Sequence, residues 1–463
     1  MKEEGDPRNT VAQVVETLSR IVGEEADELA REVGFIQRER ALSGADFVQS
    51  LIFGWLQEPE ITLDGLTQVL QRREVSISAS GLTQRFVPEA ASLLQRVLQR
   101  LSAEQMEVAP VESALLKQFC AVILEDSSSI VLPPALVEVW RGCGGSVGAS
   151  EAAIKLFVRW DVLRGQLHGL GLSDARCNDH RGPLAVEDLP AGSLYVADLG
   201  FFGVERLRTV AHGSVERPQG KRFFVSRMQV KTGLLTRQGH RIVLAGVLPQ
   251  QVGQVVEFGA LLGVAGRLPV RVILQRVPGE VAEERRERIR ETAQAHGREA
   301  DAEVLALADW TIVVTNVPRC RLSVEQVLVI LRLRWQIERL FRLWKEYGKI
   351  DEWRTKKPWR ILCEVYAKLC AMLIQHWLIQ LGCWQDPHRS LVKAAQVVRR
   401  EAGRLMSALY EGQVAPTVIA ILRCMGSGCR LNTRKTNPNT SQFVMGTPLV
   451  WPTRTFPSQK GLT

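Results

Sequence analysis

The chain has 463 residues, of which 46% are hydrophobic, and its 59 lysines and arginines exceed its 50 aspartates and glutamates to give a net charge of +9. This length is enough for roughly two to four domains, and the hydrophobic share can build real cores, as expected of a globular protein. The modest basic excess favours a polyanionic partner without naming one.

Cysteine usage and the apolar runs bear on the cellular compartment. The nine cysteines include no Cys-x-x-Cys pair and no histidine at zinc-ligand spacing, which predicts reduced thiols in a cytoplasmic protein. The start, MKEEGDPRNT, has no apolar core, so we expect no signal peptide. The longest apolar run, 369–384, is interrupted by Gln375, His376 and Gln380 and is too short for a membrane span. We expect a buried core helix and no membrane partner.

The N-terminal part has apolar residues at helical period from about residue 10 to 105, which predicts an all-helical domain. Within it, residues 62–71 and 80–86 form two short helical segments joined by a turn containing serines, the pattern of a helix-turn-helix. In that interpretation Thr83, Gln84 and Arg85 face a DNA major groove. An ordinary pair of short helices explains the same pattern.

Strand-like segments begin near residue 115. They read FCAVILEDSSSIVLP, AAIKLFVRWDV, SLYVADLGFF and KRFFVSRMQV, with a helix signal at 204–211. Strands mixed with helices predict an α/β core. Further short β-like runs, HRIVLAGVL and LPVRVILQRV, precede a highly charged helix at 282–295. That helix is typical of a solvated face, although its arginines could also follow a nucleic-acid backbone.

The last third begins with the strand-like run DWTIVVTNVP and continues into a long helix at 323–347. Ser323 and Gln326 have the spacing of a capping box, which supports the start of this helix. Residues 386–423 are again helical, and a basic tail without periodicity follows.

Charged residues in the long helix form the first part of a candidate site. Arg334, Glu338 and Lys345 are four and then seven residues apart, so at about 100° per residue they return to nearly one helix face. Upstream, Asp126 ends the apolar stretch AVILE and Asp198 closes SLYVA. Three such carboxylates can converge on two divalent ions, and oxygen ligands select Mg²⁺ or Mn²⁺. Taken singly, each is equally explained as a turn residue or a surface ion pair.

The helix segment resembles the signature Y-x₂-R-x₃-E-x₆-K of bacterial insertion-sequence transposases of the DDE type, in the hairpin-forming group called insertion sequence family four. EDSSSIVLP is similar to the first-aspartate block of that group, and VADLGFFGVERL with FFVSR is similar to the second. The resemblance covers about residues 115–440. Leu331 stands where the signature has tyrosine, and Ser128 stands where threonine often follows the first aspartate.

The resemblance implies an α/β fold: an RNase H-like mixed sheet with flanking helices, interrupted by a β-rich insertion, with an all-helical N-terminal domain and a helical C-terminal region. The expected division is a helical DNA-binding domain at 1–112, the first part of the catalytic core at 113–227, the β-rich insertion at 228–318, the second part of the core at 319–385, and a C-terminal helical region with a basic tail at 386–463.

The resemblance also implies an enzyme with Asp126, Asp198 and Glu338 as catalytic residues and ligands of two Mg²⁺ or Mn²⁺ ions. Such a transposase would bind the terminal inverted repeats of an insertion sequence, cleave double-stranded DNA through a hairpin intermediate and join the 3′ ends to target DNA. It would act as a homodimer in a synaptic complex, in the bacterial cytoplasm and on the nucleoid when bound to DNA.

Further DNA contacts are implied for Arg334 and Lys345, which would hold phosphates, for Arg227, and for Trp310, which would stack on a flipped base. Two other functions fit the sequence: an RNase H-like metal nuclease without strand transfer, and an inactive derivative that only binds DNA. Asp161, which also ends an apolar stretch, is the alternative to Asp126.

Overall fold

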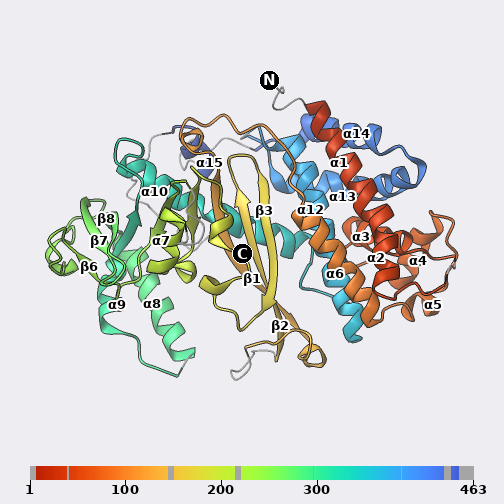
Figure 1. The fold of residues 1–463 in the computed structure, drawn as a ribbon, viewed down its shortest axis with the longest axis horizontal. Coiled ribbons are helices and arrows are strands. Elements are labelled where there is room, and N and C mark those ends of the chain that lie inside the picture. Colours follow the sequence, from red (N-terminus) through yellow and green to blue (C-terminus); the bar gives the residue numbers. More distant parts are fainter. Residues whose placement is uncertain are drawn as a thin grey trace, which may run out of the picture. The chain divides into compact units, whose positions relative to one another are not determined.

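The computed structural model describes residues 7–38, 41–143, 151–213, 220–295, 297–386, 388–431 and 439–447 (Figure 1). Its contacts divide the chain into two compact units. The first unit comprises Met1–Glu112, Ser127–Cys177 and Gln336–Lys435, and the second comprises Ser113–Asp126, Asn178–Trp335 and Thr436–Thr463. Each unit is therefore assembled from segments that are distant in the sequence.

The first unit is mainly helical. Its helices include α1 (Pro7–Ser19), α2 (Glu25–Glu32), α3 (Gly44–Gln57), α4 (Leu63–Gln71), α5 (Ala79–Thr83), α6 (Pro88–Ala103), α12 (Pro358–Cys383), α13 (Leu391–Glu411) and α14 (Val414–Gly428). Strands β2 (Ala152–Asp161) and β3 (Gln166–Asp174) form an antiparallel hairpin. The helical N-terminal region and the later helices were both expected, and α3 and α6 pack against α12.

Helix α12 forms the core of the first unit. Its 26 residues are long and apolar enough to cross a membrane by length and composition, but the apolar window is fully buried inside the protein. α6, α3 and α13 surround it. The prediction of a buried core helix at 369–384 is therefore confirmed, and the helix begins earlier than expected, with Pro358 in its first turn.

The two helical segments predicted at 62–71 and 80–86 are present as α4 and α5, but the second helix ends at Thr83 instead of continuing to residue 86. The physical reason is the next helix, α6, which has Pro88 in its first turn. Proline forces the preceding residue out of the helical region, and Val87 is accordingly extended at φ −115° and ψ 168°. Residues 84–87 therefore connect two helices.

The second unit is built on a mixed sheet. Its strand order is β1-β4-β5-β9-β8-β7-β6, with β1 parallel to β4, β4 parallel to β5, and the remaining neighbours antiparallel. The strands are β1 (Val122–Leu132), β4 (Leu194–Ala197), β5 (Phe223–Arg227), β6 (Leu234–Leu235), β7 (Val255–Leu262), β8 (Leu268–Arg276) and β9 (Trp310–Thr315). The predicted α/β class with a mixed sheet is confirmed. Residues 127–132 of β1 belong to the first unit.

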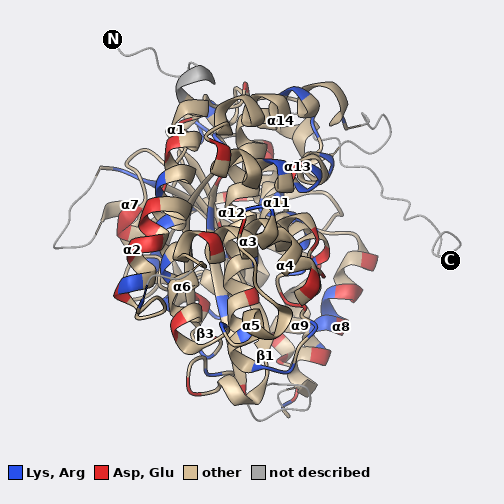
Figure 2. Cartoon of the chain, turned by 90° about the vertical axis from the view of Figure 1, so that its right-hand side faces the viewer, with Lys and Arg blue, Asp and Glu red and all other residues tan. Residues whose placement is uncertain are grey.

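Helices of the second unit are α7 (Val204–His212), α8 (Gly279–Ala295), α9 (Ala302–Ala306), α10 (Val324–Leu333) and the short α15 (Thr440–Val444). Helix α8 carries alternating acidic and basic residues (Figure 2), as expected of a solvated helix. Arg285 is an exception, because its guanidinium donates to the carbonyls of Ala308 and Trp310 at 3.2 and 3.0 Å. Burial lowers the pKa of Arg285 to about 10.

Several local predictions were wrong. β1 continues through Asp126 to Leu132, so Asp126 lies within a strand and does not end it. The run HRIVLAGVL forms a short 3₁₀ turn at Leu244–Gly246 and no strand. β3 was not predicted, because Gly169 and Gly171 weaken its strand signal. The tail is not uniformly irregular, since α14 reaches Gly428 and α15 follows. Residues 432–438 and 448–463 of the predicted basic tail lie outside the described residues.

The long helix predicted at 323–347 is interrupted. Its capping box is confirmed: the Ser323 hydroxyl accepts from the Gln326 N–H, and the Gln326 side chain accepts from the Ser323 N–H. α10 ends at Leu333, α11 (Trp335–Arg342) follows, and a π turn (Leu343–Tyr347) completes the segment. Arg334, between α10 and α11, keeps helical dihedrals, φ −48° and ψ −35°.

Candidate active site

Asp126 and Asp198 occupy neighbouring positions on two parallel strands. The paired residues of β1 and β4 end with Glu125 opposite Ala197. Asp126 directly follows Glu125 in the chain, and Asp198 directly follows Ala197. Neighbouring strands lie about 4.8 Å apart, and successive side chains alternate between the two faces. The register therefore places Asp126 and Asp198 next to each other, on the face opposite to Glu125.

Asp198 is confirmed at the end of β4, where it precedes a 3₁₀ turn (Leu199–Phe201) and its carbonyl accepts from the Phe201 N–H at 3.0 Å. Its side chain is 43% exposed, whereas that of Arg334 is only 8% exposed. Arg334 Nε lies 3.6 Å from Asp198 Oδ1. The arginine of the helix signature thus contacts the second aspartate in the folded unit.

Glu338 lies in the first turn of α11 and is half-buried. Beside it, Trp335 is 50% exposed, and the Arg334 guanidinium lies 5.9 Å from the centre of its ring. The sequence analysis used Trp335 only as a residue flanking the signature. Its exposure leaves a large aromatic surface beside Arg334.

Lys345 lies in the π turn, and its ammonium group contacts the same strand that carries Asp126. Its Nζ donates to the carbonyl of Ser129 at 2.9 Å and lies 3.4 Å from Asp351 Oδ2. The π turn changes the angle per residue, so the one-face arithmetic that predicted an aligned stripe does not hold beyond Arg342.

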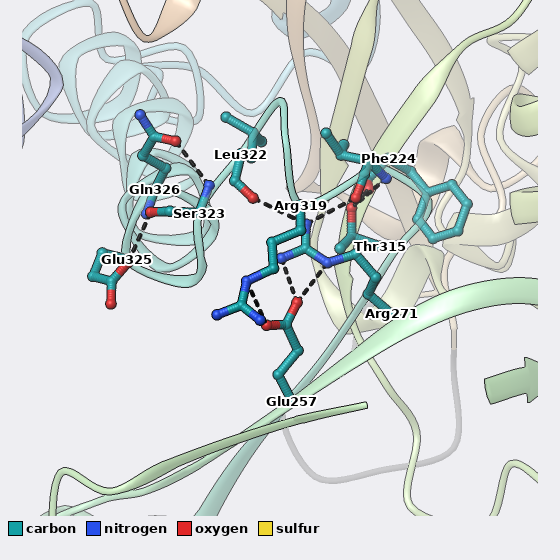
Figure 3. Close-up of polar contacts among 10 residues, drawn as sticks. Phe224, Glu257, Arg271, Thr315, Arg319, Leu322, Ser323, Glu325 and Gln326 are labelled. Carbon is teal, nitrogen blue, oxygen red and sulfur yellow. Dashed lines mark hydrogen bonds and ion pairs between the residues drawn. The ribbon is translucent and has the colours of Figure 1, made fainter. Parts of the chain in front are cut away.

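The start of α10, the helix that leads to Arg334, is held by a polar network (Figure 3). Arg271 on β8 donates through Nη1 to the carbonyls of Val317 and Leu322, at 2.8 and 3.0 Å. Its Nε donates to Glu257 on β7 at 2.7 Å. Strands of the predicted insertion therefore fix the loop between β9 and α10.

Two further predicted DNA contacts lie on the sheet. Arg227 is the last residue of β5, half-buried and paired in register with Val313 of β9. Trp310 begins β9, and its indole N–H donates to the carbonyl of Pro249 at 2.9 Å. The guanidinium of Arg276 lies 5.7 Å from the centre of the Trp310 ring.

The residues predicted to read DNA bases lie at the end of α5. The Thr83 hydroxyl donates to the carbonyl of Ala79 at 2.8 Å, which is a local helical contact. Gln84 is exposed and Arg85 is partly exposed. Gln84 and Arg85 lie after the end of α5 at Thr83, so they are not part of a helix face.

Asp161, the alternative to Asp126, is buried and caps a turn. Its Oδ1 accepts from the Leu163 N–H at 2.9 Å, and its Oδ2 lies 3.6 Å from Arg164. These contacts explain its position at the β2–β3 connection by local structure.

Sequence reasoning missed a buried ion pair next to the aspartates, between Glu125 on β1 and Arg206 on α7. Arg206 Nη2 lies 3.1 and 3.0 Å from the two carboxylate oxygens of Glu125. A signal was present in the sequence: Glu125 interrupts an apolar strand, and a buried carboxylate requires a cation or several hydrogen-bond donors.

The donor set suits a hard divalent cation. Asp126 and Asp198, both in the second unit, carry carboxylate oxygens, which Mg²⁺ and Mn²⁺ prefer. Among the described residues, no three His, Cys, Asp or Glu side chains form a ready cluster for a metal ion. The fit therefore rests on donor chemistry and on the neighbouring positions of Asp126 and Asp198. The described cysteines are all free thiols.

Comparisons with known proteins place these residues in a family context. A family model described as a transposase DDE domain matches residues 121–374, which include Asp126, Asp198, Glu338 and Lys345. The chain is 28% identical over 385 residues to the transposase for insertion sequence element IS231F of Bacillus thuringiensis subsp. israelensis, covering 78% of each chain. It is 23% identical over 385 residues to the transposase for IS1151 of Clostridium perfringens, covering 77% of this chain and 78% of that one.

Among solved structures, a piggyBac transposase synaptic complex with hairpin DNA aligns with 95% of this chain and 88% of its own, at a TM-score of 0.42 and 10% identity. A likeness this distant supports no functional argument.

Proposed function

The chain belongs to the transposase DDE domain family, and on this premise we propose that it cleaves the ends of an insertion sequence and joins them to target DNA by metal-dependent phosphoryl transfer. The observation that carries this proposal is the register of β1 and β4, in which Asp126 and Asp198 directly follow the last paired residues. Two carboxylates at adjoining positions, Asp126 within β1 and Asp198 just after β4, suit a shared divalent ion.

We further propose that Asp126, Asp198 and Glu338 hold two Mg²⁺ or Mn²⁺ ions within an RNase H-like core. When bound, such ions activate an attacking oxygen and stabilise the leaving oxygen of a phosphodiester. The chain's own contribution is to fix the carboxylates. Asp198 is anchored by the turn that follows β4 and by Arg334, and the parallel pairing of β1 with β4 supports the placement of Asp126.

Arg334 and Lys345 are proposed to bind the phosphates on either side of the cleaved bond. A guanidinium can bind a phosphate through two parallel hydrogen bonds, while an ammonium acts as a point charge. Arg334 is preorganised because it is buried and paired with Asp198. Lys345 would exchange part of its contact with Ser129 or Asp351 for the phosphate. Arg227, at the end of β5, is proposed as a further phosphate contact.

We propose a hairpin intermediate, in which Trp310 stacks on an unpaired base. Base stacking on an aromatic ring contributes about 1–3 kcal/mol. The base would take the position of Arg276 over the indole ring, while the bond from the indole N–H to Pro249 keeps the ring oriented. Trp310→Ala is expected to lower hairpin yield more than first-strand nicking.

Recognition of the terminal inverted repeats is assigned to the helical N-terminal region, with Thr83, Gln84 and Arg85 at the DNA. We expect a homodimer in the synaptic complex, because the two ends of an element are cut together, and we expect it in the bacterial cytoplasm on nucleoid DNA. The division into five segments at residues 112, 227, 318 and 385 remains our proposal.

The test is cleavage of labelled DNA that carries the element's terminal repeats, with purified protein and Mg²⁺. Asp126→Asn, Asp198→Asn and Glu338→Gln should each abolish cleavage and leave DNA binding intact. Asp188→Asn and Glu346→Gln are matched controls, because both residues are exposed, and they should keep full activity. Full activity in Asp126→Asn would remove that residue from the site.

The products separate the alternatives. Nicks without hairpins or joined products would indicate a metal nuclease without strand transfer. Specific DNA binding without any cleavage would indicate an inactive derivative, for which Leu331 in place of tyrosine is the motivating observation.

A further inference from the structure

Arg206 connects three segments that surround the predicted aspartates. It extends from α7, and its Nη2 contacts both oxygens of Glu125, the residue before Asp126. Its Nε and Nη2 lie 3.3 and 3.1 Å from the hydroxyl of Tyr195, three residues before Asp198. Its guanidinium lies 5.6 Å from the ring centre of Phe201, three residues after Asp198.

This cluster lies on the opposite face of the sheet from the aspartate pair. Ile123 pairs with Tyr195 and Glu125 with Ala197, so Glu125 and Tyr195 point to the same face, and the aspartates point to the other. Arg206 Nη1 also donates to the carbonyl of His180 at 3.2 Å. The arginine is thus fixed on several sides behind the pair.

The ion pair is buried, which makes it sensitive to change. The Glu125 side chain is fully buried and that of Arg206 is 10% exposed. Burial lowers the pKa of Arg206, but the nearby Tyr195 and Glu125 outweigh burial and raise it, so the guanidinium stays charged. Removing one partner of a buried pair leaves an uncompensated charge, and a shift of the β1 backbone around Glu125 and of the C-terminal end of β4 would relieve it.

We infer that Arg206 is a positioning residue for the Asp126 and Asp198 pair: by binding Glu125, Tyr195 and Phe201 from behind the sheet, it sets how the two carboxylates share a divalent ion. The inference rests on the proposed function. A positioning role is distinguishable from a purely structural one. Replacing a structural residue changes the fraction of folded protein, whereas replacing a positioning residue changes the metal affinity of the protein that is folded.

The test compares Arg206→Lys with Arg208→Lys. Both residues are on α7, but Arg208 is 48% exposed and lies 3.2 Å from Glu205, so it is a matched control. Tyr195→Phe is the milder variant and removes only the hydroxyl that contacts Arg206. Three quantities are measured: Mn²⁺ binding without DNA by electron paramagnetic resonance, the Mg²⁺ concentration for half-maximal cleavage, and the melting temperature. Asp198→Asn is the reference for Mn²⁺ binding.

Arg206→Lys is expected to weaken Mn²⁺ binding and to raise the Mg²⁺ requirement by roughly 10–100-fold, as residues that orient metal ligands do. Tyr195→Phe should shift both in the same direction by less, and Arg208→Lys should shift neither. DNA binding without metal should be unchanged in all three. If Arg206→Lys does not fold, Tyr195→Phe decides the question.

Two results would overturn the inference, and they are distinguishable. If the wild type binds Mn²⁺ in a manner that Asp198→Asn abolishes, yet the folded Arg206→Lys and Tyr195→Phe variants match it, Arg206 is not a positioning residue and the proposed function stands. If the wild type shows no Mn²⁺ binding that depends on Asp198, the proposed metal site fails and the inference fails with it.

Discussion

Replacing Arg271 by methionine should destabilise the second unit far more than the same change at Arg319, although both arginines contact Glu257 (Figure 3). Arg271 is 14% exposed and also binds the carbonyls of Val317 and Leu322. Arg319 is 78% exposed and lies 3.5 Å from Glu257. The pair therefore compares a buried and an exposed cation on one carboxylate.

The magnitudes follow from these contacts. Methionine fills part of the Arg271 volume but leaves two carbonyls without their donor, and it leaves the 15% exposed Glu257 with only the exposed Arg319, 3.5 Å away. Truncating one partner of a buried ion pair costs about 3–5 kcal/mol. An exposed ion pair contributes at most about 1 kcal/mol, so Arg319→Met should be close to wild type.

Urea unfolding at pH 7, with hydrogen exchange of residues 317–326 as the local measurement, distinguishes the two variants. Arg271→Met should lower the free energy of unfolding by the larger amount and speed up exchange at the start of α10. It should also slow DNA cleavage, because that helix leads to Arg334. Equal, small effects of the two substitutions would refute the view that insertion strands fix the start of α10.

Other predictions concern single positions. Burial lowers the pKa of His376 to about 4, below its ordinary 6.5, so the unfolded chain binds more protons than the folded chain between these pH values. The free energy of unfolding should therefore be at its full value above pH 6.5 and fall by up to about 3 kcal/mol as the pH drops to 4. Urea midpoints measure this loss, which should be smaller in His376→Gln. Stability that does not change over this range in the wild type would contradict a buried neutral imidazole. Gly165→Ala should lower the melting temperature strongly, because Gly165 has φ +72° and an added Cβ would lie 2.3 Å from the Trp384 side chain. A melting temperature like that of the wild type would count against this packing. Leu331→Tyr should cost about 1–3 kcal/mol by overpacking, since Leu331 is 8% exposed, and should not raise hairpin yield; a clear gain in hairpins would show that the missing hydroxyl matters.

Local patterns in the sequence were sufficient for many elements. Apolar runs predicted β2, β4, β5, β8 and β9 within a few residues, and the spacing of Ser323 and Gln326 located the start of α10. These features depend on residues that are close in the chain, so a sequence window contains their causes. The glycine-containing β3 has no such signal, and it forms because β2 lies beside it in the hairpin.

The candidate site divides in the same way. The sequence by itself determined which residue types are available for metal and phosphate chemistry: Asp126, Asp198, Glu338, Arg334 and Lys345. Carboxylates and cations at fixed spacings are a property of the chain and need no fold to be recognised.

Only the tertiary structure decided how several of these residues are held. Register between β1 and β4 pairs Glu125 with Ala197, the residues just before Asp126 and Asp198, although 72 positions separate the two aspartates in the numbering. The contacts of Arg206 with Glu125 and of Lys345 with Ser129 likewise join distant segments. Strand pairing and buried ion pairs depend on which surfaces meet when the chain collapses, and no local window of sequence contains that information.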